Sequence, residues 1–208
     1  MKNAVHHKVK IYKSLELALK DLEPFVRDGH HLLKGRPFEK FGEQRSREMI
    51  ANWLLCVVLN FEHKTTAYRF SSDPSGGDGL ICDTNQNVGF PTEHVMVYQH
   101  GNQPTRTSED GIAAAVDSKQ SKGATYASGK LLIVFNETGG GTVWLPNAAA
   151  RRLPKNDFHA VWVVGLNLVV DECYVYYVTQ LDLSNGDSPS WQVKIANDFG
   201  SWEVRRIQ

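Results

Sequence analysis

The feature that most limits the fold is a continuous apolar run, KLLIVF at residues 130–135, with a helix predicted directly before it. An unbroken apolar run of this length is typical of a buried strand. The preceding segment, residues 109–122, has Ser108 as its N-cap. One face of this predicted helix carries Ile112, Ala115, Val116 and Lys119. A buried strand that follows an amphipathic helix favours an α/β protein.

Further elements precede this helix. Residues 43–62 form the strongest predicted helix, because apolar side chains recur at i, i+1, i+4 and i+5. Three strands are predicted after it, at 66–70, 80–83 and 93–99, separated by turns rich in glycine and proline. The predicted order over residues 43–136 is therefore α-β-β-β-α-β.

Both ends of the chain add to this order. Residues 14–22 predict an amphipathic helix that Pro24 and Gly29 delimit. Downstream of the buried strand, two long strands rich in valine and tyrosine are followed by a tail with shorter strands. We therefore divide the chain into an N-terminal helical extension, residues 1–42, and one domain, residues 43–208.

Charge and cysteine usage restrict the class of protein. The 208 residues contain 23 basic and 23 acidic side chains, so binding to a polyanion requires a local basic patch. No apolar run is long enough to span a membrane or to act as a secretion signal. The odd number of cysteines in apolar runs indicates buried reduced thiols and a cytoplasmic location. These cysteines are Cys56, Cys82 and Cys173.

Two carboxylates lie where consecutive predicted strands begin. Asp78 follows Gly76 and Gly77 directly before the strand at 80–83, and Glu93 opens the next strand. A hairpin between these strands brings the carboxylates close enough to share Mg²⁺ or Mn²⁺, which prefer oxygen ligands. The simpler alternatives are an ordinary Gly-Asp-Gly turn and a surface glutamate at a strand end.

The element order and these two carboxylates resemble the common core of the PD-(D/E)XK nucleases, and GGDGLICD is similar to the Gly-Asp-Gly stretch of Mrr-like restriction enzymes. The resemblance covers residues 43–136. It implies a restriction-endonuclease-like fold and a magnesium-dependent endonuclease that hydrolyses DNA in restriction or antiphage defence. It also implies an acidic residue on the first core helix that completes the metal site. Glu48 matches that position best and Glu43 second, although both also read as solvated carboxylates beside arginines.

The sequence departs from the family pattern at one position. The family has a lysine two residues after the glutamate, where this chain has Val95. Gln99 lies on the same strand face as Glu93, and Lys119 lies on the inward face of the following helix. We favour Lys119 as the residue that activates water, with Lys122 as its substitute. The alternative is that both lysines cover apolar surface with their stems.

Other polar residues are weaker candidates. Arg151 and Arg152, together with Lys155, form a basic cluster that could contact phosphates beside Lys122, or simply end a short helix. His94 faces the side of its strand opposite to Glu93 and is assigned to packing.

Three functions follow from these observations. The leading hypothesis is a metal-dependent nuclease acting on DNA, with Asp78, Glu93 and Glu48 as metal ligands and Lys119 as the catalytic lysine. The second is a catalytically inactive module of the same fold that binds nucleic acid or a protein partner, which Val95 favours. The third is an unrelated α/β binding domain. A homodimer would suit an enzyme that cuts two strands.

Overall fold

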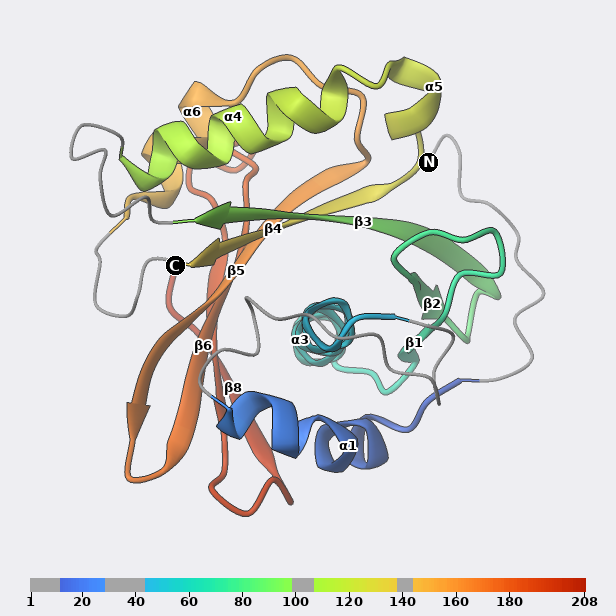
Figure 1. Cartoon of the computed structure of the whole chain (residues 1–208), viewed down its shortest axis with the longest axis vertical. Coiled ribbons are helices and arrows are strands. Elements are labelled where there is room, and N and C mark those ends of the chain that lie inside the picture. The colour runs from blue at the N-terminus through green and yellow to red at the C-terminus, as the bar shows by residue number, and fades with distance from the viewer. Residues whose placement is uncertain (1–11, 29–43, 99–106, 138–143) are drawn as a thin grey trace.

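The computed structural model describes residues 12–28, 44–98, 107–137 and 144–208. Helices and strands are mixed along these residues, which confirms the α/β class (Figure 1). The helices are α1 (Leu15–Arg27), α3 (Ser46–Glu62), α4 (Ser108–Gln120), α5 (Ala124–Ala127) and α6 (Pro146–Arg152). The strands are β1 (Tyr68–Ser71), β2 (Leu80–Asp83), β3 (Val88–Tyr98), β4 (Leu131–Glu137), β5 (Ala160–Val170), β6 (Cys173–Gln180), β7 (Ser190–Ile195) and β8 (Trp202–Arg206). No helix among the described residues is long and apolar enough to cross a membrane.

The described strands form one eight-stranded sheet in which strand order follows chain order. Strands β1 to β3 pair antiparallel, β3 to β5 pair parallel, and β5 to β8 pair antiparallel again. The parallel connection from β3 to β4 passes through α4, as a crossover requires. In Figure 1 β3 and β4 run across the view while β6 and β8 run down it, so the sheet is strongly twisted.

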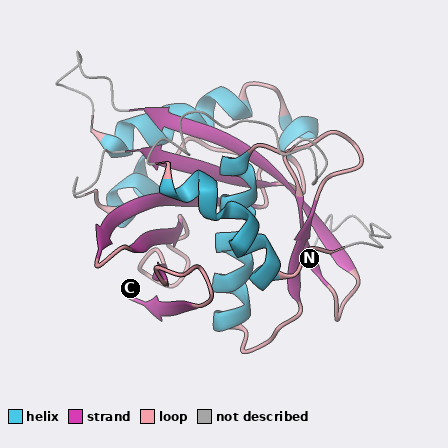
Figure 2. Ribbon diagram, turned by 60° about the horizontal axis from the view of Figure 1, so that its bottom comes forward, coloured by secondary structure: helices cyan, strands magenta, loops and turns pink. Residues whose placement is uncertain are grey.

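Helices cover both faces of the sheet. Helices α1 and α3 pack on one face, and α4, α5 and α6 pack on the other (Figures 1 and 2). Strand β4 lies between the two layers and is buried from Leu131 to Asn136. This burial on both faces explains why its sequence is a continuous apolar run.

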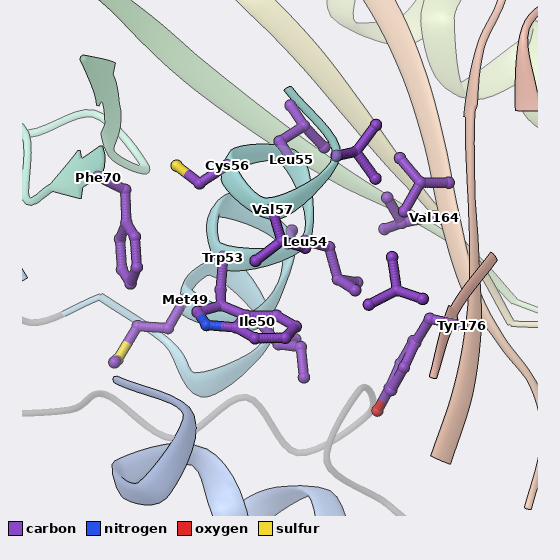
Figure 3. Packing of buried hydrophobic residues seen from close by; sticks show 14 of the residues in the cluster. Met49, Ile50, Trp53, Leu54, Leu55, Cys56, Val57, Phe70, Val164 and Tyr176 are labelled. Carbon is purple, nitrogen blue, oxygen red and sulfur yellow. The ribbon is translucent and has the colours of Figure 1, made fainter. Parts of the chain in front are cut away.

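Helix α3 is the centre of the larger core. Its side chains pack toward the strands and toward α1, and Figure 3 shows Leu54 directed at Val164 and Tyr176. The indole Nε1 of Trp53 donates a hydrogen bond of 2.8 Å to the carbonyl oxygen of Leu15 in α1. Helix α1 therefore shares one core with α3, while the segment 29–43 between them lies outside the described residues.

Two proline positions correct the predicted boundaries. Pro24 lies inside α1, which continues to Arg27, because burial of Val26 keeps the last turn packed. Strand β3 begins at Val88 rather than at residue 93 and contains Pro91. Strand β4 first pairs with β3 at Thr92, so Pro91 needs no N–H donor on that side.

The cysteine prediction holds in part. Cys56 and Cys82 are buried free thiols, whereas Cys173, at the start of β6, is half-buried.

Candidate functional site

Asp78 lies beside Glu93 because of the register between β2 and β3. Leu80 pairs with Pro91, and the N–H of Thr92 donates to the carbonyl oxygen of Gly79 at 2.8 Å. At the next position of the ladder, the N–H of His94 donates at 2.7 Å to Oδ2 of the Asp78 side chain. The Asp78 carboxylate therefore continues the pairing with β3 just before β2 begins, and it lies next to Glu93.

Two lysines meet the Glu93 carboxylate, which is largely buried. Lys119 Nζ, from the last turn of α4, lies 2.9 Å from Glu93 Oε2. Lys130 Nζ, at the start of β4, lies 3.4 Å from Glu93 Oε1. The exposed fractions of the three side chains are 11% for Glu93, 17% for Lys119 and 26% for Lys130. These ion pairs are thus partly shielded from water.

The local charges hold both carboxylates ionised. Burial alone would raise the pKa of Asp78, but the contacts of His94 with the carboxylate and the charge of Lys119 outweigh it and lower that pKa to about 2. Burial also acts to raise the pKa of Glu93, but Tyr126 and Lys119 hold it below its usual range. Burial and then Glu93 and Asp78 raise the pKa of Tyr126. The site is a compact group of coupled charges.

A buried polar shell holds the main chain at Asp78. Gln44 Nε2 and Asn52 Nδ2 donate to the carbonyl oxygen of Asp78 at 2.5 and 3.2 Å. Asn52 is fully buried on α3, whose other buried side chains are mostly apolar. Among the described residues, the remaining amide oxygens of Gln44 and Asn52 have no hydrogen-bond partner, nor does the hydroxyl of Thr92. Unpaired buried polar atoms are costly and rare, so their gathering around the main chain at Asp78 and Gly79 makes this part of the molecule a candidate site.

His94 supports Asp78 and faces away from Glu93, as predicted from strand alternation. Its ring packs against Phe135, with ring centroids 5.9 Å apart. Its Nδ1 lies 3.5 Å from Asp78 Oδ2, a contact that lacks hydrogen-bond geometry. His94 therefore meets the carboxylate through its main-chain N–H and, more distantly, through its ring.

The predicted acidic residue of the first core helix has a structural contact. Glu48 Oε2 accepts a hydrogen bond of 2.8 Å from the N–H of Arg45, at the N-terminus of α3. Glu48 lies one helical turn from Asn52 and so shares the helix face that meets Asp78. Its carboxylate is nevertheless engaged by the helix end. Glu43, the second choice, lies outside the described residues.

The other predicted residues divide between two ends of α4. Lys122 lies near the carboxylates, with Nζ 3.2 Å from the Tyr126 hydroxyl. Arg152 lies at the opposite end, where it binds Asp110 at 2.9 Å, nine positions and about 13 Å of helical rise from Lys119. Arg151 is exposed at the end of α6. Neither arginine shares the carboxylate site, and Gln99 lies outside the described residues.

Five residues of the site were missed from the sequence: Gln44, Asn52, Thr92, Tyr126 and Lys130. Asn52 carried a usable signal, because it is a polar residue on the buried face of an apolar helix. Lys130 and Tyr126 carried none, because their approach to Glu93 depends on the register of β4 and on the turn into α5.

Two carboxylates of the site could serve a divalent cation that keeps several water ligands. The described residues contain no group of three or more histidine, cysteine or acidic side chains that could hold a metal. Mg²⁺ is commonly bound by one or two carboxylates together with water and substrate phosphate. Asp78 and Glu93 supply two such carboxylates, and the His94 N–H occupies Oδ2 of Asp78 rather than Oδ1. An open, mostly hydrated magnesium site is compatible with this arrangement.

Comparisons with known proteins found no relative of this chain. The sequence matches no protein-family model, and neither a curated protein nor a solved structure matches the chain.

Proposed function

We propose that the chain is a metal-dependent nuclease that hydrolyses phosphodiester bonds at Asp78, Glu93 and Lys119. The observation that carries the proposal is the 2.9 Å contact between Lys119 Nζ and Glu93 Oε2. A lysine from α4 thus reaches the glutamate, although the strand position that holds the lysine in the nuclease family is Val95 here. The order α3, β1, β2, β3, α4, β4, with only the short α5 inserted, supports the same proposal.

Each residue has a distinct role in this proposal. Asp78 and Glu93 would hold the cation, which would neutralise charge on the phosphate and lower the pKa of bound water. Lys119 orients the attacking water or binds a phosphate oxygen. Its side chain is largely buried, and its hydrogen bond to Glu93 holds the ammonium group beside the carboxylates. Lys130 adds a second positive charge on the other oxygen of Glu93. The polar shell keeps the main chain at Asp78 fixed.

A catalytically inactive module that binds nucleic acid or protein is the second candidate. Two observations favour it. Both oxygens of Glu93 face ammonium groups, and Asp78 accepts a hydrogen bond from the main chain of β3. Such contacts also suit a purely structural cluster.

Cleavage separates the two candidates. Plasmid DNA, single-stranded DNA and RNA are incubated with pure protein in Mg²⁺, Mn²⁺ or EDTA, for the wild type and for Asp78→Asn, Glu93→Gln and Lys119→Met. We expect metal-dependent cleavage that falls at least about 100-fold in each variant. Arg152→Met, which removes exposed contacts with Asp110 and Thr107 at the far end of α4, is the matched control and should cut normally. If pure wild type cuts nothing with either metal, the inactive module replaces the nuclease.

A further inference from the structure

The two edges of the sheet differ in how their main-chain groups are covered. At the first edge, the N–H and the carbonyl oxygen of Tyr68 in β1 bond to the side chain of Asn60, at 2.9 and 3.0 Å. The carbonyl oxygen of Phe70 accepts a hydrogen bond of 3.3 Å from the N–H of Lys13. At the other edge, β8 pairs only with β7 among the described strands, and Figure 2 shows the strand beside the C-terminus at the rim of the molecule. The chain therefore covers the β1 edge with its own groups and leaves β8 as an edge strand.

Alternate residues of β8 direct their main-chain groups away from β7. Just before β8, the carbonyl oxygen of Ser201 accepts a hydrogen bond of 3.1 Å from the N–H of Ala196. Just after it, the N–H of Ile207 donates at 2.8 Å to the carbonyl oxygen of Ser190. In an antiparallel ladder such bonded positions alternate with positions whose N–H and C=O groups face the other side. The residues with outward main-chain groups are consequently Trp202, Val204 and Arg206, and these groups can pair with another strand.

The sequence of β8, WEVRR, is complementary to itself when two copies run antiparallel. With Val204 opposite Val204 at the twofold axis, Glu203 of each copy comes opposite Arg205 of the other. Both charged side chains are exposed, and neither takes part in an ion pair among the described residues. They fall at the non-hydrogen-bonded positions of the new ladder, where opposite Cα atoms are only about 4.5 Å apart. Two favourable charge pairs therefore form across the axis.

Charge also selects this register over its neighbours. The nearest registers that keep the outward groups paired place the twofold axis at residue 203 or at residue 205. The first puts Glu203 against Glu203, and the second puts Arg205 against Arg205. Like charges directly opposite each other destabilise a strand pair. Charged side chains usually keep an edge strand unpaired, but the order of charges on this edge admits one antiparallel arrangement.

We propose that β8 pairs with β8 of a second copy of this chain, so that the two sheets join in a twofold-symmetric dimer. The contact uses the same strand of both copies, and assembly ends at two copies because the β1 edge is already covered. The inference is independent of the proposed nuclease function. A five-residue strand pair is a small interface, so we expect a Kd on the order of micromolar.

Charge reversal tests the pairing. Sedimentation velocity from about 1 to about 200 µM protein should show the wild type shifting from monomer to dimer as its concentration rises. Glu203→Arg puts arginine opposite arginine and Arg205→Glu puts glutamate opposite glutamate, so each should weaken self-association roughly 10- to 100-fold. Mixed in equal amounts, the two variants should form a heterodimer with about the wild-type Kd, because each arginine then faces a glutamate.

Two further variants separate strand pairing from other causes. Val204→Pro removes the N–H at the axis, which β7 does not use, so it should abolish the dimer and leave the circular dichroism spectrum unchanged. Asp117→Arg reverses an exposed charge on α4 and should leave Kd unchanged. A wild type that is monomeric at every concentration, or a dimer that both charge reversals leave intact, overturns the inference. It is also overturned if the two folded charge-reversal variants fail to associate when mixed.

Discussion

The two ends of α4 carry ion pairs with the same 2.9 Å separation in very different surroundings. At the C-terminal end, Lys119 and Glu93 are 17% and 11% exposed, and at the N-terminal end Arg152 and Asp110 are 45% and 46% exposed. An exposed pair contributes little to stability, whereas burying charges has a large desolvation cost. Distance alone therefore does not identify a site. The buried end is the unusual one, and it also holds Asp78.

The largest expected effect comes from the polar shell of the buried end. Gly79 has φ +143°, and a Cβ there would overlap Gln44 Nε2 and Asn52 Nδ2. Gly79→Ala should lower the free energy of unfolding by about 3–5 kcal/mol, through backbone strain and steric overlap. Gly76→Ala, at φ +86° in open space, should cost only about 1 kcal/mol. Urea unfolding measures both, and equal effects would show that the shell is loosely packed.

Breaking the buried ion pair should have the next largest effect. Lys119→Met keeps most of the stem but leaves Glu93 short of one partner, so we expect a loss of about 2–4 kcal/mol. Lys122→Met, whose ammonium contacts Tyr126 instead, should change stability by less than about 0.5 kcal/mol. A double-mutant cycle with Glu93→Gln gives the coupling energy. A coupling near zero would mean that the contact is too weakly formed to position a catalytic lysine.

Periodicity and side-chain alternation were enough to predict most of the elements. Residues 80–83 were predicted as a strand and form β2, and the helix predicted at 109–122 is α4 at Ser108–Gln120. The predicted boundaries were wrong at two prolines, because whether a helix or strand tolerates a proline depends on neighbouring elements that a sequence pattern does not show. Pro91 is accepted since β4 begins one residue too late to require its N–H.

Only those residues of the candidate site could be predicted whose position follows from the pattern of a single helix or strand. Lys119 was chosen because it shares a helical face with Ile112 and Val116, which are buried, and that face does meet Glu93. Lys130 needs the pairing of Glu93 with Leu132, which places a residue two positions before Leu132 on the same face of the sheet. Register between distant strands is a tertiary property, so this lysine could not be found from spacing.

Acid titration should distinguish the two ends of α4, because the free energy of unfolding should lose about 2 kcal/mol at the end that holds Asp78. The folded pKa of Asp78, about 2, lies below the unfolded value of about 3.9, so its charge stabilises the metal-free fold above about pH 4. That contribution of about 2 kcal/mol is lost as pH falls from about 4 to about 2. Asp78→Asn should flatten this part of the profile in urea unfolding with EDTA. Asp110→Asn should flatten it less, because the Thr107 hydroxyl lowers the pKa of Asp110 at an exposed site where water screens the interaction. Equal profiles for wild type and Asp78→Asn would contradict the low pKa of Asp78.

Salt should sharpen the comparison at the exposed end, where the smallest effect is expected. Asp110 also binds the Thr107 hydroxyl at 2.9 Å, so Arg152 adds to a contact that already holds the start of α4. A double-mutant cycle of Arg152→Ala with Asp110→Ala should give a coupling of about 0.2–1 kcal/mol at low salt. In 1 M NaCl the Debye length is about 3 Å, so this coupling should vanish while that of Lys119 with Glu93 persists. Equal salt sensitivity of both pairs would mean that water reaches Lys119 and Glu93 freely, and the electrostatic case for a catalytic site at that end of α4 would then fail.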